Sequence, residues 1–419
     1  MTALERRFPR PKDFAPLMKP GPWERDSTKR RLAKARDVWD LRRIARRRTP
    51  AGPFHYADGG SDGEVSLRRA REAFADLDFR PGVLRDVARS DMTTTVLGQP
   101  SALPFGFAPT GFTRMMHSAG ERAVVAVAER AGIPFCLSTV GTASIGQIAS
   151  IAPKARKWFQ LYLWKDRELS LELVRDAKAA GYEALLVTVD VPVSGNRLRD
   201  QRNGMTIPPR LTAKTFLDAS YRWRWWFDFL STEPYSFAFD TTGRGSLGDL
   251  MRRLADPSVT FADLAWLREA WDGPVLVKGI TSVEDALAAL EHGADGVVVS
   301  SHGGRQLDRG PVALHVLPDI VAAVGDRGTV VLDTGIMNGG DIVAAIALGA
   351  DFTLVGRAFL YGLMAGGEAG VARCVEILSA EIERTMKFLG VAALDELHPG
   401  HVRLMSRRAP IGVAGQPIP

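Results

Sequence analysis

The chain has 419 residues, of which 46% are hydrophobic and 24% are charged. This composition is typical of a globular protein with one large or two modest domains, and it excludes a fibrous or largely disordered chain. Cys136 and Cys374 are too few for a disulfide framework and lack metal-ligand spacing, so we expect a reducing compartment and no metal. The longest apolar run is broken by Asp341 and Asp351, and no apolar core follows the first arginines. We therefore expect neither a membrane span nor a secretory signal.

Positive charge is concentrated at the N-terminus. The net charge is +6, yet residues 1–48 alone hold 16 Lys or Arg against 6 Asp or Glu. The rest of the chain is slightly acidic, which argues against a nucleic-acid-binding surface on it. Leu32, Val38, Leu41 and Ile44 recur at roughly helical spacing and predict one helix over residues 29–48. Two interpretations stay open: a helix packed on the body, or a contact with an anionic partner or membrane surface.

Eight short apolar runs alternate with amphipathic segments from about residue 103 onward. Runs without polar alternation are typical of parallel strands buried on both faces. Eight such units predict a (β/α)8 TIM barrel rather than a doubly wound sheet. Gly181, Gly293 and Gly349 end three of the amphipathic segments, where a left-handed cap belongs. The runs are 103–108, 133–137, 158–163, 184–189, 274–278, 296–299, 329–332 and 352–355.

One interval is too long for a simple loop and predicts an insertion after the fourth strand, at about residues 200–260. The predicted organisation is a basic N-terminal arm (1–50), a barrel with this insertion (51–400) and a C-terminal tail (401–419). Residues 221–240 hold nine of the chain's 34 aromatic residues, interleaved with arginines. That mixture suits a membrane interface. The alternative is a loop packed over the barrel mouth or a subunit contact.

The carboxyl ends of the strands are where TIM barrels carry reactive residues. His302 follows the sixth strand beside two glycines and Arg305, a setting that suits a general base for an anionic substrate. A lone histidine is otherwise more often structural. Asp190 from another strand could orient the imidazole, and Arg197 with Arg305 offers fork-shaped donors that match a carboxylate.

Further charged residues and glycines follow the fifth, seventh and eighth strands. Lys278 ends an apolar run and needs an anion, because lysine is rarely buried unpaired. Gly335, Gly356 and Arg357 follow the last two strands, where barrels commonly bind phosphate. Tight turns alone would also explain the glycines.

Residues 301–308, Ser-His-Gly-Gly-Arg-Gln-Leu-Asp, resemble the active-site motif of the FMN-dependent α-hydroxy acid dehydrogenases and oxidases. The resemblance runs from about residue 38 to 397. Within this family the chain is most similar to bacterial L-lactate dehydrogenases that pass electrons to a quinone or cytochrome, as residues 356–362 and 367–371 indicate. Supporting segments are 56–60, 108–111, 158–162, 186–192 and 276–279.

The resemblance implies a role for each matching residue. His302 would be the base, Asp190 would stabilise its protonated form, and Lys278 would favour the anionic reduced flavin. The implied catalytic residues are His302, Asp190, Tyr162 and Lys278. The implied substrate-binding residues are Tyr56, Tyr162, Arg197, His302 and Arg305. The implied FMN-binding residues are Pro109, Thr110, Gly111, Ser138, Gln160, Thr188, Lys278, Ser300, Asp333, Gly335, Gly356 and Arg357.

The implied activity is the FMN-dependent oxidation of an L-2-hydroxy acid, first of all L-lactate to pyruvate, with a quinone or cytochrome as acceptor. An oxidase of the same family would instead use O2 and release H2O2. A non-redox phosphate-binding barrel would explain Gly356 and Arg357, but not His302, Arg305 and Lys278 together. The resemblance also implies a homotetramer. The two cysteines favour the cytoplasm, and the aromatic insertion adds a peripheral contact with the inner face of the cell membrane.

Three positions bear on how far the family pattern applies. Ser301 stands where the family usually has Asn, and we expect it to tune activity rather than abolish it. Met337 stands where many members have an Arg that contacts the FMN phosphate, so we expect looser cofactor binding. Gly111 replaces an Ala found in many oxidases and favours a dehydrogenase.

Overall fold

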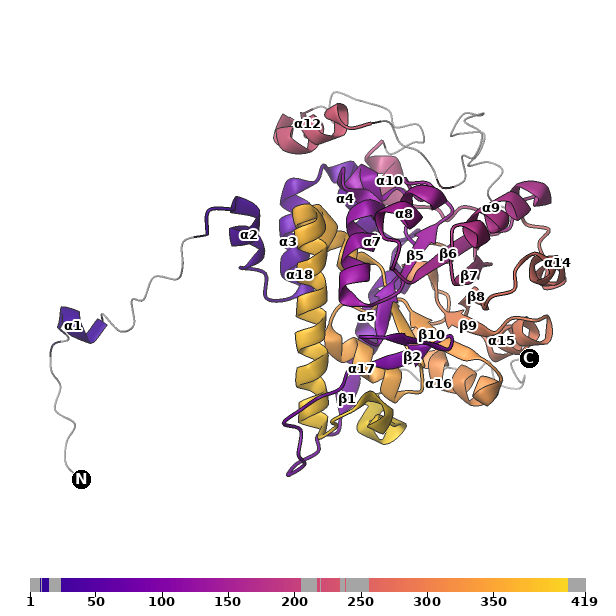
Figure 1. Ribbon diagram of the computed structural model, residues 1–419. Helices are drawn as coiled ribbons and strands as arrows, with labels where there is room; N and C mark the ends of the chain where they lie inside the picture. The colour runs from indigo at the N-terminus through magenta and orange to yellow at the C-terminus, as the bar shows by residue number, and fades with distance from the viewer. Residues whose placement is uncertain are drawn as a thin grey trace.

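The computed structural model describes residues 8, 10–14, 24–204, 217–218, 220–233, 238 and 256–405. Within these residues, eight parallel strands close into a barrel surrounded by helices (Figure 1), which confirms the predicted (β/α)8 fold. The strands follow one another in chain order around the barrel, and the last pairs with the first. They are β4 (Phe105–Phe107), β5 (Phe135–Ser138), β6 (Lys157–Tyr162), β7 (Ala184–Thr188), β8 (Val275–Ile280), β9 (Gly296–Val299), β10 (Thr329–Asp333) and β11 (Phe352–Val355).

Amphipathic helices cover the outside of the barrel. Gly181, Gly293 and Gly349 have φ angles of 73°, 93° and 100°, so the predicted left-handed caps are confirmed. Such caps turn the chain sharply from each helix back into the next strand. The covering helices are α7 (Gly120–Ala131), α8 (Ile145–Ile151), α9 (Arg167–Ala179), α14 (Asp263–Ala270), α15 (Val283–Glu291), α16 (Ala313–Val324), α17 (Gly339–Ala347) and α18 (Arg357–Leu389).

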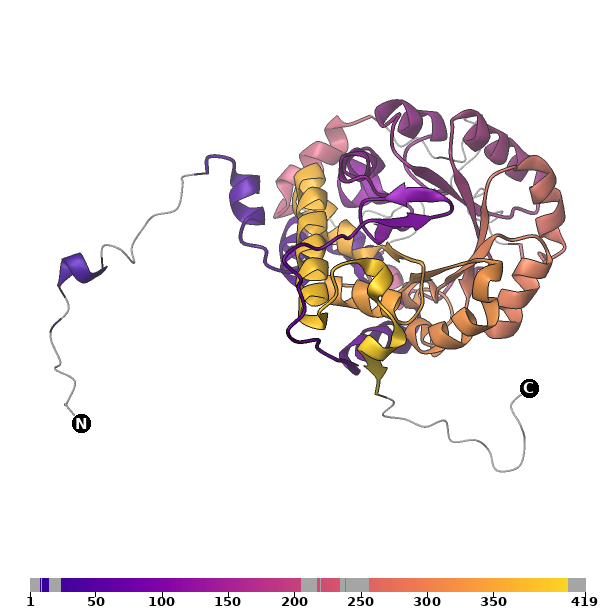
Figure 2. The same ribbon diagram turned by 60° about the horizontal axis from the view of Figure 1, so that its bottom comes forward.

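The inside of the barrel is a packed core. Trp158 and Phe352 lie with their ring centroids 6.0 Å apart and are fully buried, together with Leu186 and Val298. Val96 joins this cluster from the hairpin of β2 and β3, which lies across the ring in Figure 2. Because apolar side chains fill the interior, a ligand can enter only at the mouth.

Shorter elements flank the barrel. β1 pairs with β12 in a two-stranded antiparallel sheet, so residues 402–404 of the predicted tail pack on the body. Residues 406–419 lie outside the described part of the chain. The remaining helices and strands are α1 (Pro11–Phe14), α4 (Ala51–Asp58), α5 (Val65–Ala75), α6 (Thr113–Met116), β1 (Leu77–Phe79), β2 (Thr94–Val96), β3 (Gln99–Ser101) and β12 (Val402–Leu404), with 3-10 helices at His302–Gly304, Gly325–Arg327, Leu394–Glu396 and Pro399–His401.

Residues 29–48 of the basic arm fall in two helices, α2 (Ser27–Leu32) and α3 (Val38–Arg48), so the prediction of one continuous helix is wrong. The physical reason is Asp37, whose carboxylate caps the start of α3 and begins a new helix there. Leu41 and Ala45 are fully buried, and α3 lies against α18 (Figure 1). The interpretation of the arm as a packed helix is therefore confirmed for α3.

The predicted insertion at about 200–260 is described in part. Residues 205–216, 219, 234–237 and 239–255 lie outside the described ranges. The described part contains α10 (Leu198–Arg202) and α12 (Trp223–Ser231), and α12 lies close to α4 and α10 at one end of the barrel (Figure 1). Among the described residues, we find no helix with the length and apolar character needed to cross a bilayer.

The contact of α3 with the barrel can be tested with Leu41→Ala. Removing this fully buried side chain leaves a cavity, and we expect the free energy of unfolding to fall by about 2–5 kcal/mol. The matched control is Arg47→Ala on the exposed side of α3, with an expected change within about 0.5 kcal/mol. Chemical denaturation measures both. Equal stability of the two variants would contradict a packed arm.

Candidate active site

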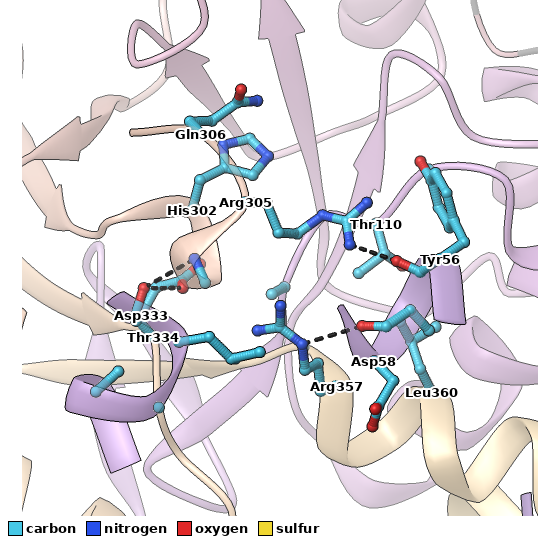
Figure 3. Close-up of a pocket in the computed structure, with 18 of the residues that line it drawn as sticks. Tyr56, Asp58, Thr110, His302, Arg305, Gln306, Asp333, Thr334, Arg357 and Leu360 are labelled. Carbon is cyan, nitrogen blue, oxygen red and sulfur yellow. Dashed lines mark hydrogen bonds between the residues drawn. The ribbon is translucent and has the colours of Figure 1, made fainter. Parts of the chain in front are cut away.

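A cavity of 510 Å³ opens at the carboxyl ends of the barrel strands. Figure 3 shows His302 and Arg305 on one side of it, Tyr56 and Thr110 on another, and Arg357 below Arg305 in this view. Residues from many separate elements meet here because barrel closure brings all the strand ends to one rim. The predicted site residues that line the cavity are Tyr56, Pro109, Thr110, Gly111, Ser138, Tyr162, Arg197, Lys278, His302, Arg305, Asp333, Gly335, Gly356 and Arg357.

His302 and Asp190 form a hydrogen-bonded pair. The distance from His302 Nδ1 to Asp190 Oδ1 is 3.0 Å. Burial acts to raise the pKa of Asp190, but His302 and Lys278 outweigh it, so this pKa lies below its ordinary value. Gly279 makes room for Asp190, since a Cβ at this left-handed residue would lie 2.6 Å from the Asp190 Cγ. A carboxylate that stays ionised therefore faces one ring nitrogen of the histidine.

His302 itself has a strained backbone, with a φ of 53°. Its amide donates to the Ser300 hydroxyl at 3.0 Å, and the following glycines also take left-handed angles. This turn points the ring toward Asp190 across the mouth of the barrel. Strain of this kind persists only where the surroundings hold the residue in place, and it is commonest at functional sites.

Two guanidinium groups lie over the ring of Tyr56. The Arg305 guanidinium carbon is 4.7 Å from the ring centroid and that of Arg197 is 5.2 Å away. Burial and the nearby Arg197 lower the pKa of Arg305 to about 10, which still leaves it charged at neutral pH. Two partly buried positive charges beside one ring favour the binding of an anion nearby. Arg197 also pairs with Asp200 at 3.1 Å.

Lys278 is buried and paired with an anion, as expected for a lysine at the end of an apolar run. Its Nζ lies 3.4 Å from an Asp333 oxygen and 3.1 Å from the Ser300 hydroxyl. Burial acts to lower the pKa of Lys278, but Asp333 and Asp190 outweigh it, so this pKa is raised. Lys278 therefore presents a permanent positive charge at the floor of the cavity.

Four predicted site residues lie outside the cavity lining: Gln160, Thr188, Asp190 and Ser300. Asp190 and Ser300 contact residues of the lining, as described above. The Gln160 amide nitrogen and the Thr188 hydroxyl are buried without a hydrogen-bond partner. Buried polar groups usually have partners, so these two fit a polar ligand bound beside them, and Gln160 already contacts Ser138 of the cavity lining.

The part of the cavity around Arg357 and Gly335 suits the binding of an anion. The Arg357 guanidinium donates to the carbonyl oxygens of Ala57 at 3.0 Å and Gly59 at 2.7 Å. Gly335 has a φ of 87°, and a Cβ there would lie 2.9 Å from a backbone oxygen of α5, so glycine is needed at this position. Met337 also lines the cavity, with its amide bonded to Asp341 at 2.7 Å.

Sequence reasoning missed the walls that come from outside the barrel strands. Arg71 of α5 lines the cavity and contacts the carbonyl of Gly335 and the carboxylate of Asp341. Phe112 and Met116 line another side. Phe112 and Met116 lie in an apolar segment without a polar motif, and Arg71 lies in an amphipathic segment beside other arginines, so no signal in the chain marks them as site residues.

Comparison with known proteins identifies the family. Residues 45–404 match the family of FMN-dependent dehydrogenases. The chain belongs to the FMN-dependent dehydrogenase family. A protein of Mycobacterium tuberculosis provisionally named L-lactate dehydrogenase is 54% identical over 98% of this chain and 99% of its own. The L-lactate dehydrogenase of Chromohalobacter salexigens is 41% identical over 85% of this chain and 93% of its own.

One solved structure is similar to this FMN-dependent dehydrogenase over most of the chain. It is that of the monotopic membrane protein (S)-mandelate dehydrogenase, with a TM-score of 0.85 and 38% identity over 88% of this chain and all of that one. The chemistry of the residues at the cavity fits FMN, the cofactor of the family. A buried lysine, two unpartnered buried polar atoms and an arginine beside glycines match a polar ring system that ends in a phosphate.

The fit to FMN can be tested with Lys278→Met. Loss of the buried cation leaves Asp333 without its ion-pair partner and removes a positive charge near Asp190, and we expect the affinity for FMN to fall roughly 10- to 100-fold, as for one charge-assisted hydrogen bond. Equilibrium dialysis with FMN fluorescence measures it. The control is Lys157→Met, another buried lysine, whose Nζ donates to the Ala155 carbonyl at 2.8 Å away from the cavity. Equal loss in both variants would point to general destabilisation.

Proposed function

We propose that this FMN-dependent dehydrogenase oxidises an L-2-hydroxy acid to the 2-oxo acid, with L-lactate as the preferred substrate. The observation that carries the proposal is the His302–Asp190 pair beside two arginines that converge over Tyr56. A base next to a carboxylate-binding group is what the oxidation of a hydroxy acid needs. Relatives named L-lactate dehydrogenase support lactate, whereas the mandelate dehydrogenase shows that the fold also serves a larger substrate.

Arg197 and Arg305 would hold the substrate carboxylate between them. Their fork-shaped donors match its two oxygens, and the partial burial of both strengthens the attraction. Tyr56 and Tyr162 would contact the carboxylate and the hydroxyl group. Burial raises the pKa of Tyr162, so its hydroxyl remains a proton donor at neutral pH. This arrangement holds the substrate with its reacting carbon near His302.

His302 would take one proton from the substrate. When its Nδ1 donates to Asp190, Nε2 is free to accept the proton, and the ionised carboxylate stabilises the positive charge that results. Whether the proton leaves the hydroxyl or the α-carbon first, the same base serves. The strained turn at residue 302 fixes this ring before the substrate arrives.

Bound FMN would supply the two-electron acceptor for the substrate. Lys278 would face the ring carbonyl and stabilise negative charge there. Asp190 would then serve His302, and Asp333 would balance Lys278. The proposed FMN-binding residues are Ser138, Gln160, Thr188, Lys278 and Ser300 at the ring and ribityl chain, Pro109, Thr110 and Gly111 along one face, and Asp333, Gly335, Gly356 and Arg357 at the phosphate end.

The electrons would pass to a quinone in the membrane, and α12 supports this part of the proposal. Trp223, Phe227 and Leu230 are 63%, 66% and 73% exposed and share one face of the helix. Arg224 lies over the Trp223 ring at 5.2 Å. An apolar face with aromatic and basic residues suits the surface of a bilayer. We propose a cytoplasmic homotetramer that contacts the inner face of the membrane through α12.

The first test is the visible spectrum of the purified protein with and without L-lactate in the absence of oxygen. We expect yellow absorbance near ~450 nm, as flavin provides, and bleaching on addition of L-lactate. His302→Gln should keep the absorbance and bleach roughly 100- to 10,000-fold more slowly, the usual contribution of a general base. If (S)-mandelate bleaches the flavin and L-lactate does not, lactate is not the substrate. If the His302→Gln variant is bleached as fast as the wild type, His302 is not the base. Reoxidation of the reduced flavin is then compared with a quinone and with O2 as acceptor. Faster reoxidation by the quinone indicates a dehydrogenase, and faster reoxidation by O2 indicates an oxidase.

Membrane contact can be tested by flotation with lipid vesicles. The triple variant Trp223→Gln, Phe227→Gln, Leu230→Gln should stay unbound while the wild type floats, because the apolar face of α12 is lost. The matched control replaces Val83, Leu84 and Phe388 by Gln, since these residues are also strongly exposed but lie away from α12. If both triple variants float like the wild type, α12 does not bind the bilayer.

A further inference from the structure

Two short helices form the wall of the cavity opposite His302. α4 carries Tyr56, and α6 follows Phe112 and ends at Met116. The rings of Tyr56 and Phe112 contact edge to face, with centroids 5.9 Å apart and planes at 85°. Helices of eight and four residues leave most of their end groups without partners within the helix. Their positions therefore depend on groups supplied from elsewhere.

α4 receives its N-terminal cap from the insertion. Its own N-cap position is Pro50, which has no side chain able to accept a hydrogen bond. The Asp218 carboxylate accepts from the Ala51 amide at 2.7 Å, across 167 residues of chain. A negative charge at a helix N-terminus also interacts favourably with the helix dipole. The insertion thus holds the start of the helix that presents Tyr56.

α6 receives its C-terminal partner from the same insertion. The Trp225 indole N–H of α12 donates to the Met116 carbonyl at 3.2 Å, the last carbonyl of this one-turn helix. Trp225 is itself held by Phe229, whose ring stacks on it with a centroid distance of 5.0 Å, and by the ring of Trp226 in an edge-to-face contact at 5.4 Å. The donor is therefore fixed by a cluster of aromatic rings.

Asp218 is linked to α12, the helix of Trp225, through Arg222. Arg222 forms an ion pair with Asp218 just before α12 and also reaches the Arg46 carbonyl at the end of α3. The same stretch of chain therefore contacts the arm, α4 and α6. The opposite face of α12 is the exposed apolar face described above. One side of this helix holds the cavity wall and the other side faces outward.

We propose that Asp218 and Trp225 are positioning residues that set the affinity for the hydroxy acid, an inference that rests on the proposed function. They cap α4 and α6 and so hold Tyr56, Phe112 and Met116 in place. His302 and Asp190 come from the ends of β9 and β7 and keep their hydrogen bond without the insertion's help. Loss of either cap therefore weakens substrate binding and leaves the rate of the chemical step unchanged.

The test is the anaerobic bleaching of the flavin by L-lactate, measured as a rate against lactate concentration. This curve gives an apparent Kd and a limiting rate separately. We expect Trp225→Phe and Asp218→Ala each to raise the apparent Kd by up to about fivefold, which corresponds to the ~1 kcal/mol of one hydrogen bond, with the limiting rate preserved. The apparent Kd for pyruvate, titrated by the flavin absorbance, should rise in parallel.

Two controls separate positioning from general damage. Trp223→Phe makes the same exchange on the exposed face of α12, away from the Met116 carbonyl, and should leave the Kd unchanged. Asp218→Asn keeps an acceptor oxygen for the Ala51 amide and should bind lactate more tightly than Asp218→Ala. An unchanged Kd in Trp225→Phe and Asp218→Ala, or a loss confined to the limiting rate, would overturn the inference. Failure of the wild type to bleach with lactate would instead overturn the proposed function.

Discussion

The balance of buried charge at the barrel mouth is the constraint on which the rest of this structure depends. A lysine on β8 meets one carboxylate that follows β7 and another at the end of β10, and none of the three could be buried alone without a large desolvation penalty. Lys278 is held by Asp333, and Asp190 is held by His302, while Lys278 and Asp190 also lower each other's cost of ionisation. The barrel makes this possible because its parallel strands place their carboxyl ends together.

The charge balance explains why the site residues lie in pairs rather than singly. Ser300 joins the two pairs, since its hydroxyl accepts from both Lys278 and the His302 amide. A change at one member therefore alters the environment of the others, and their effects on catalysis will not simply add. The cation at the floor and the base at the rim are parts of one hydrogen-bonded network.

A second network joins the elements outside the barrel. The buried carboxylate of Asp58 pairs with Arg42 of the arm and with Arg199 of α10 at 2.9 Å, and it accepts from the Tyr361 hydroxyl of α18 at 2.8 Å. The desolvation cost of such a carboxylate is met only when all these partners are present. Arm, insertion and barrel are therefore held together next to the cavity, which explains why segments distant in the chain form its walls.

The amino-acid sequence by itself determined the barrel and the residues at its mouth. Unbroken apolar runs indicate strands buried on both faces, and the fold then places the residue after each strand at the active site, so His302, Arg305 and Lys278 could be found without coordinates. Only the tertiary structure decided which acidic residue pairs with which basic residue. The pairing of Lys278 with Asp333 depends on the distance between side chains of different strands, and no spacing in the chain encodes that distance.

The walls of the cavity also could not be predicted from the sequence, because they depend on contacts between distant segments. Asp218 caps a helix that begins 167 residues earlier, and Trp225 bonds to a carbonyl 109 residues away. Sequence patterns report local periodicity and local capping, whereas these contacts arise when an insertion folds back over the barrel. The arm shows that a local sequence pattern, here the helical spacing of apolar residues, can also lead to a wrong prediction. Its helical spacing is real, but the capping carboxylate of Asp37 divides it into two helices, because a capped helix start is more stable than a continuous turn through that residue.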